Sequence, residues 1–196
     1  AARFRRAILE MLVPQLKELV QILMILAEQE SETVQLGRTH GQPAIPVTVG
    51  YWLAGYVSRL GNAIMQLQQL SNQLVGKCTG AVGASNALTL LLEQKSVQGS
   101  DVTERVISFE KDFLEKLDLK PAEHSTQIVP HEPMIRLMNE IVLTMGIIAD
   151  LCDDVRQLQR AEIAEVGEQF SEHQVGSSTM PHKQNPISFE NGKSLW

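Results

Sequence analysis

The fold class can be predicted from residues 133–158, which read PMIRLMNEIVLTMGIIADLCDDVRQL. Mostly apolar side chains recur there at alternating spacings of three and four, the pattern of a helix that packs against other helices. Pro133 suits the first turn of such a helix, because its missing N–H would have no partner there. The seam of this helix is expected at Met134, Leu137, Ile141, Thr144, Ile148, Leu151, Val155 and Leu158.

Earlier stretches of the chain repeat this spacing. Leucines recur from Leu12 to Leu26, in a helix that Pro14 is expected to bend. A second helix is predicted from about Val47 to Val75, and a shorter one begins with Asp101 and Glu104 in capping-box positions. One face of the shorter helix is apolar, and we expect it to lie in the core. Its members are Val102, Val106, Phe109, Phe113 and Leu117.

Strand signals are nearly absent from the sequence. Neither sustained period-two runs nor hairpin turns between such runs are found, so the predicted class is all-α. Helices of about 30 residues would be roughly 45 Å long, more than a compact domain of this size needs. We therefore expect a long-helix bundle that assembles with other subunits and carries its function in the loops.

The composition limits the setting and the partners. The 196 residues are 43% hydrophobic and carry a net charge of −6 without a basic face, so neither nucleic acid nor a membrane surface is an expected partner. Two cysteines, Cys78 and Cys152, are too few for a disulfide scaffold and favour the cytoplasm. The chain begins at Ala1 and stops at Trp196, where a new helix begins. It is expected to be one domain, 1–196, of a longer protein.

The first loop with chemical potential is Gly37–Ala44, GRTHGQPA. It can be a plain connection between helices with a solvated histidine. However, His40 can exchange a proton near neutral pH, and Arg38, Thr39 and Gln42 offer donors for carboxylate and amide oxygens. This clustering makes His40 a candidate acid or base, with Arg38 and Thr39 as candidate substrate-binding residues.

Two further loops contain small and polar residues. Gly76–Ala87, GKCTGAVGASNA, is either a tight reversal or a glycine-rich nest that binds an anion, with Thr79, Ser85 and Asn86 as possible ligands. It lacks the spacing of a nucleotide-binding P-loop. Ser125–His131, STQIVPH, can be a simple connector but contributes Gln127.

The last loop is Val175–Asn185, VGSSTMPHKQN, in which flexible and rigid residues alternate as they do in a lid. A serine that acts as a base needs amide donors and positive charge to stabilise its alkoxide. Lys183 and the N–H groups of the loop could supply both. A serine nucleophile of the hydrolase type is less attractive, because no GxSxG elbow is present.

This loop carries the strongest resemblance in the chain. Gly176–Asn185 matches every fixed position of GSSxMPxKxN, the signature of the fumarase/aspartase superfamily of lyases. Within the superfamily the chain most resembles the adenylosuccinate lyase family, and the resemblance spans essentially the whole chain. The segments that carry it are RTHGQPA at 38–44, KCTGAVGASNA at 77–87, STQIVPHE at 125–132 and MPHKQNPISFEN at 180–191.

The resemblance implies a central helical domain, a homotetramer, and active sites built by loops from three subunits. It also implies cleavage of adenylosuccinate to AMP and fumarate, and of the related carboxamide ribotide of purine synthesis, without a metal or cofactor. His40 matches the general acid and Ser177 the general base. Positions that hold the substrate are matched by Thr39, Gln127, Ser178, Lys183 and Asn185.

Other members of the superfamily remain alternatives. Carboxymuconate cycloisomerases share MPHK, whereas argininosuccinate lyases usually read MPQK and fumarases MPGK, so His182, itself a possible site residue, favours the first group and adenylosuccinate lyases. Gln127 and the RTHGQPA run favour the latter. A structural descendant without catalysis is the other alternative, and intact His40, Ser177 and Lys183 argue against it. Most of the phosphate-binding residues of the family lie outside this chain.

Overall fold

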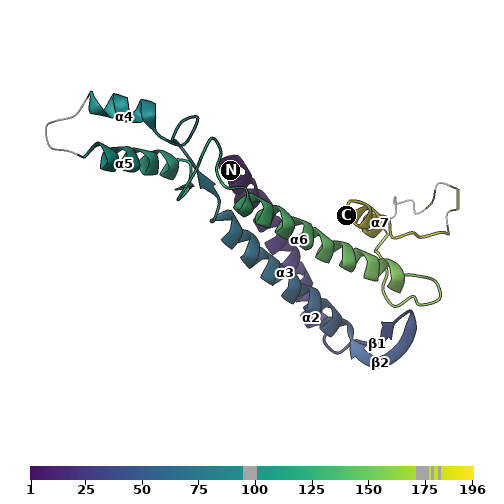
Figure 1. The fold of residues 1–196 in the computed structure, drawn as a ribbon. Coiled ribbons are helices and arrows are strands. Elements are labelled where there is room, and N and C mark those ends of the chain that lie inside the picture. The colour runs from purple at the N-terminus through teal and green to yellow at the C-terminus, as the bar shows by residue number, and fades with distance from the viewer. Residues whose placement is uncertain (95–100, 171–176, 178, 181) are drawn as a thin grey trace. The chain divides into compact units, whose positions relative to one another are not determined.

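The computed structural model describes residues 1–94, 101–170, 177, 179–180 and 182–196. Helices dominate, as the sequence predicts (Figure 1). The chain divides into two compact units: the first comprises Ala1–Gln15 and Ile64–Glu140, and the second Leu16–Ala63 and Ile141–Trp196. Within the described ranges, no helix is both long and apolar enough to cross a membrane.

Three long helices form where the seams predict them: α2 (Val13–Gln29), α3 (Val49–Ser71) and α6 (Glu132–Leu158). Each contributes leucines to a cluster that forms the core of the second unit. The buried members are Leu23 of α2, Leu53, Tyr56 and Leu60 of α3, and Leu151 and Val155 of α6. The alternating spacing therefore identified most of the packed faces, but Leu26, the last residue of the predicted leucine seam, is 41% exposed.

Pro14 changes the helix locally but does not end it. The first helix begins as α1 (Ala2–Ala7), widens into a π-helical turn at Ile8–Leu12, and continues as α2. The N–H of Val13 bonds to the carbonyl of Ile8, five residues back. Proline has no N–H to continue the regular ladder, so a widened turn just before it accommodates the break.

A β-hairpin lies where we expected only a connection between helices. Strand β1 (Val34–Thr39) pairs antiparallel with β2 (Gln42–Thr48), and His40 and Gly41 form the turn with φ values of 54° and 72°. Two consecutive positive φ values are typical of the tight turn that closes a hairpin. The expectation of a chain without strands was therefore wrong here. Most side chains of β2 are exposed, so no period-two apolar pattern marks the strand.

The first unit contains two shorter helices, α4 (Asn86–Glu93) and α5 (Val102–Glu115), and two-residue parallel strands, β3 (Val75–Gly76) and β4 (Lys120–Pro121). Helix α4 was not predicted from the sequence. The predicted start of α5 is confirmed. Asp101 is the N-cap, and its Oδ1 accepts the N–H of Thr103 at 2.8 Å.

The expected core face of α5 is only partly buried. Val106 and Leu114 are buried, whereas Phe109, Phe113 and Leu117 are 43%, 42% and 40% exposed. The prediction that these three residues lie in the core was therefore wrong for this structure. The buried row follows a spacing of four along the helix, and the aromatic residues lie beside that row.

Candidate active site

His40 lies at the tip of the hairpin, in the turn between the two strands. Its side chain is exposed, as are those of Thr39 and Gln42, which pair across the turn. An exposed imidazole can meet a substrate from solution, as an acid for a leaving group must. The roles of His40 and Thr39 stay predictions.

Arg38 is engaged within the protein. Its Nη1 and Nη2 each donate to a carboxylate oxygen of Glu165 at 2.7 Å, and Nη1 also donates to the carbonyl of Leu36 at 3.1 Å. The hydrogen bond raises the pKa of Arg38 and lowers the pKa of Glu165. Arg38 thus fastens the hairpin to the segment after α6. Its predicted contact with substrate is not tested, and most of its donors have partners here.

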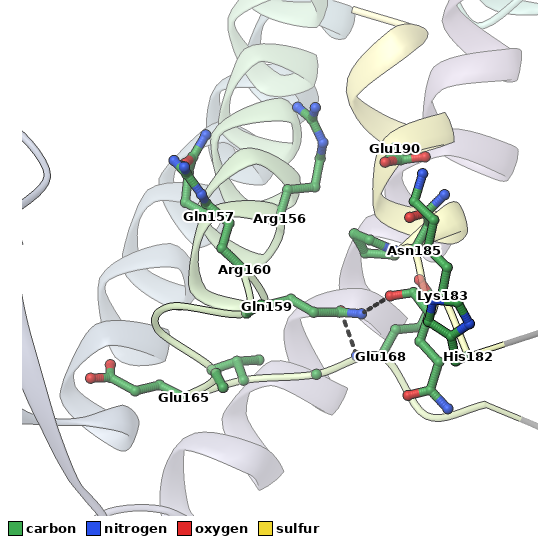
Figure 2. A pocket seen from close by; sticks show the side chains of 16 residues that line it. Arg156, Gln157, Gln159, Arg160, Glu165, Glu168, His182, Lys183, Asn185 and Glu190 are labelled. Carbon is green, nitrogen blue, oxygen red and sulfur yellow. Dashed lines mark hydrogen bonds between the residues drawn. The ribbon is translucent and has the colours of Figure 1, made fainter. Parts of the chain in front are cut away.

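A cavity of about 810 Å³ lies between the end of α6 and the signature segment (Figure 2). His182, Lys183 and Asn185 line one side, and Arg156 of α6 and Arg160, just after the helix, line the other. The structure therefore brings these three predicted residues together. The cavity carries charges of both signs, since its remaining lining includes Glu165, Glu168 and Glu190.

Lys183 is a cation of this cavity without an ion-pair partner among the described residues. Arg156 bonds to Asp153 at 2.8 Å, and Arg160 lies 3.8 Å from Glu162. Lys183, in contrast, makes no ion pair with any residue in the described part of the chain. Its ammonium is available to a carboxylate that enters from outside.

Ser177 lies in a turn that directs amide N–H groups at its side chain. Its Oγ accepts from the N–H of Met180 at 3.3 Å and of Thr179 at 3.5 Å. Donors of this kind stabilise negative charge on oxygen, which a serine base requires. Ser178, predicted to bind substrate, lies outside the described residues, as do Gly176 and Pro181 of the signature.

Gln159 fastens both ends of the segment that contains Ser177 and Lys183. Its Nε2 donates to the carbonyl of Gln184 at 3.1 Å, and its Oε1 accepts the N–H of Glu168 at 2.8 Å (Figure 2). The Glu168 carboxylate in turn accepts the hydroxyl of Ser188 at 2.6 Å and its N–H at 3.1 Å. One glutamine at the end of α6 therefore joins two points 16 residues apart.

A second cavity of about 670 Å³ lies on the hairpin side of α6. Arg38 and Gly41 line it, and it shares Gln157 and Arg160 with the first cavity. Asp154 also lines this cavity. Its Oδ2 accepts a hydrogen bond from Trp52 Nε1 at 2.9 Å and another from the Tyr56 hydroxyl at 2.5 Å. Burial, followed by this hydrogen bond, raises the pKa of Tyr56.

The remaining predicted residues lie in the first unit. Thr79 Oγ1 and Ser125 Oγ are 3.1 Å apart, so the glycine-rich loop contacts the segment that contains Gln127. Gln127 is exposed. Ser85 has a φ of 55° and precedes α4 without capping it, and Asn86 is the exposed first residue of that helix. Anion binding by this loop stays a prediction.

Several functional candidates could not be found from the sequence. Arg156, Gln159, Arg160, Glu168 and Glu190 line the first cavity, yet polar and charged residues of this kind are usually solvated. Only the folding of the signature segment onto α6 brings them to a site. In the described part of the chain, no group of three His, Cys, Asp or Glu side chains could hold a metal ion.

Comparison with curated proteins places this geometry in context. The chain is 41% identical over 176 residues to the adenylosuccinate lyase of Pyrococcus abyssi, covering 89% of the chain and 36% of that protein. It is 32% identical over 182 residues to the adenylosuccinate lyase of Thermotoga maritima, covering 92% and 38%. The chain therefore spans less than half the length of these relatives.

Comparison with solved structures supports the same fold. A class II fumarase from Schistosoma mansoni aligns with a TM-score of 0.73 over 97% of the chain and 42% of the fumarase, at 23% identity. At that identity the likeness shows the fold alone. A sequence model of a lyase family matches residues 3–195, nearly the entire chain. The chain belongs to this lyase family, within the fumarase/aspartase superfamily.

Proposed function

We propose that this chain is the central part of an adenylosuccinate lyase, which cleaves adenylosuccinate to AMP and fumarate, and the related carboxamide ribotide of purine synthesis. Relatives with that name match most of the chain. The observation that carries the proposal is at Ser177, whose Oγ accepts two amide N–H bonds in the segment that also contains Lys183. An oxygen in that setting is suited to take a proton from carbon.

The proposed reaction is a β-elimination. The Ser177 alkoxide takes a proton from the carbon beside a substrate carboxylate, and the electron pair moves into that carboxylate. Lys183 and amide N–H groups stabilise the charge that develops there. The pair then forms the carbon–carbon double bond as the carbon–nitrogen bond breaks. His40 protonates the departing nitrogen, so fumarate and the amine leave.

We also propose that the protein is a cytoplasmic homotetramer whose sites combine loops of several subunits. Exposed apolar residues on the long helices support an assembly, since large apolar faces on a lone subunit mark interfaces. On α2 they are Ile22, Met24, Ile25 and Leu26, and on α6 Ile135, Met138, Val142 and Leu143.

The test uses the full-length protein and the ultraviolet absorbance change that accompanies cleavage of adenylosuccinate. We expect turnover by the wild type, a fall of at least about 100-fold in the Ser177→Ala and His40→Ala variants, and no action on argininosuccinate. Circular dichroism should show that both variants keep their helices. Turnover of argininosuccinate alone would reassign the substrate, and full activity of Ser177→Ala would refute the mechanism.

A further inference from the structure

Three backbone carbonyl oxygens surround the ammonium group of Lys77. Its Nζ donates to the carbonyls of Gly80 at 2.5 Å, Thr126 at 2.6 Å and Gln127 at 2.9 Å. An ammonium group has three donors and no acceptor, so these bonds occupy all of its hydrogens. Lys77 therefore has no donor left for a substrate anion in this arrangement.

These bonds join two segments that are about 50 residues apart, the glycine-rich loop and the segment that contains Gln127. Two other contacts connect the same two segments. Thr79 Oγ1 lies 3.1 Å from Ser125 Oγ, and a Cβ on Gly83 would lie 2.1 Å from the Ser125 carbonyl oxygen. Gly83 also has a φ of 81°, so only glycine fits this close approach.

The exposed side chain of Gln127 extends from a backbone that Lys77 holds at two consecutive carbonyls. Fixing successive peptide planes restricts the direction in which the side chain between them can point. Thr126 and Gln127 are exposed residues, so the bonds from Lys77, rather than burial of these residues, hold their backbone.

We propose that Lys77 is a positioning residue, which orients Gln127 toward the substrate by fixing the backbone of Thr126 and Gln127. This rests on the proposed function, in which Gln127 holds part of adenylosuccinate. The competing role for Lys77 is direct binding of a substrate anion. The two roles differ in whether the effect of Lys77 passes through Gln127.

The first experiment needs no activity. Hydrogen–deuterium exchange of the full-length protein is compared with its Lys77→Met variant, which keeps the length of the side chain and removes its donors. We expect exchange in the peptide covering 122–130 to rise by about tenfold, with the rest of the chain unchanged. Lys111→Met, on an exposed side chain of α5, is the matched control and should change nothing there. Unchanged exchange in Lys77→Met would overturn the proposal.

The second experiment separates positioning from direct binding. In the wild-type background, we expect Lys77→Met to lower kcat/KM for adenylosuccinate by about tenfold. In the Gln127→Ala background, the same substitution should lower kcat/KM by less than about twofold. Losses that multiply in the double variant would show that Lys77 acts on the substrate itself. If the wild type does not turn over adenylosuccinate, the proposed function fails while the exchange result still decides the role of Lys77.

Chemical rescue tests the geometry. In Lys77→Ala, methylammonium should restore part of the activity and of the exchange protection, because it brings three N–H donors into the space. Tetramethylammonium at equal ionic strength has the charge without any donor and should restore neither. Equal rescue by the two ions would contradict a role based on the three carbonyl bonds.

Discussion

Arg38 and Glu165 form a two-bonded ion pair across 127 residues of sequence, with both N–O distances at 2.7 Å. The pair joins the hairpin that carries His40 to the segment between α6 and the signature residues. A planar guanidinium matches a carboxylate in this way, whereas an ammonium cannot. We therefore expect the charge of Glu165 to help hold the hairpin in place.

The pH dependence of stability should reveal this pair. The hydrogen bond from Arg38 lowers the pKa of Glu165 below the ordinary value of 4.5. A carboxyl with a lowered pKa in the folded state contributes stability above the ordinary pKa and loses it as pH falls through the folded pKa. In urea unfolding at pH 7, the free energy of unfolding of the wild type should be larger than that of Glu165→Gln. The difference should shrink progressively below about pH 4.5.

An equal difference between the two proteins at pH 7 and pH 3 would show that the carboxyl contributes through packing rather than charge. Arg38→Lys serves as a companion variant. It keeps the positive charge but replaces two parallel bonds with one, so its unfolding midpoint should lie below that of the wild type.

The hydroxyl of Tyr56 should stabilise the second unit. It donates to Asp154 at 2.5 Å from a side chain that is only 6% exposed. Tyr56→Phe leaves the carboxylate with Trp52 as its remaining aromatic donor and should lower the free energy of unfolding by about 1–2 kcal/mol. Tyr51→Phe is the control. Tyr51 is 75% exposed, and its hydroxyl has no hydrogen-bond partner among the described residues. Tyr51→Phe should therefore change the free energy of unfolding by no more than about 0.5 kcal/mol.

The same cluster shows how much of the fold could be predicted. Burial of Leu53, Leu60 and Leu151 follows from spacing alone, because a repeat of three and four leaves one face for the core. The hairpin has no comparable signal. Strand β2 is largely exposed, and its Pro43 and Pro46 indicate a loop. The turn depends on positive φ values at His40 and Gly41.

The candidate site was only partly visible for a related reason. Lys183 and Asn185 belong to a compact motif, so the sequence indicates them as candidates, and both line one cavity of the structure. Gln159 is an ordinary polar residue near the end of a helix, and its partners lie 9 and 25 residues away. Such a role depends on where a loop returns to the helix, which local patterns do not specify.

Gln159 provides a test of that role. Gln159→Leu removes its donor and its acceptor at once, so the ends of the signature segment lose their common attachment to α6. We expect kcat of the full-length protein to fall by about tenfold or more, since small displacements of substrate-positioning groups are costly. The helical content should remain. Gln66→Leu changes the same chemistry on an exposed position of α3 and should leave kcat unchanged.

The opposite result would also be informative. If Gln159→Leu lowers kcat no more than Gln66→Leu does, the signature segment reaches its active position without this attachment. A parallel loss of helical content would instead indicate that Gln159 contributes to folding, and the tenfold effect could not then be assigned to positioning.

Assembly should depend on the exposed apolar face of α6. Val142 is 53% exposed and Leu143 is 61% exposed, so a charge there does not disturb the packing within one chain. In an assembled bundle the same charge would be buried without a partner, which costs several kcal/mol. Val142→Asp should therefore lower the mass found by light scattering while the helical content of the protein is kept. An unchanged mass in Val142→Asp would mean that this face of α6 is not an interface between subunits.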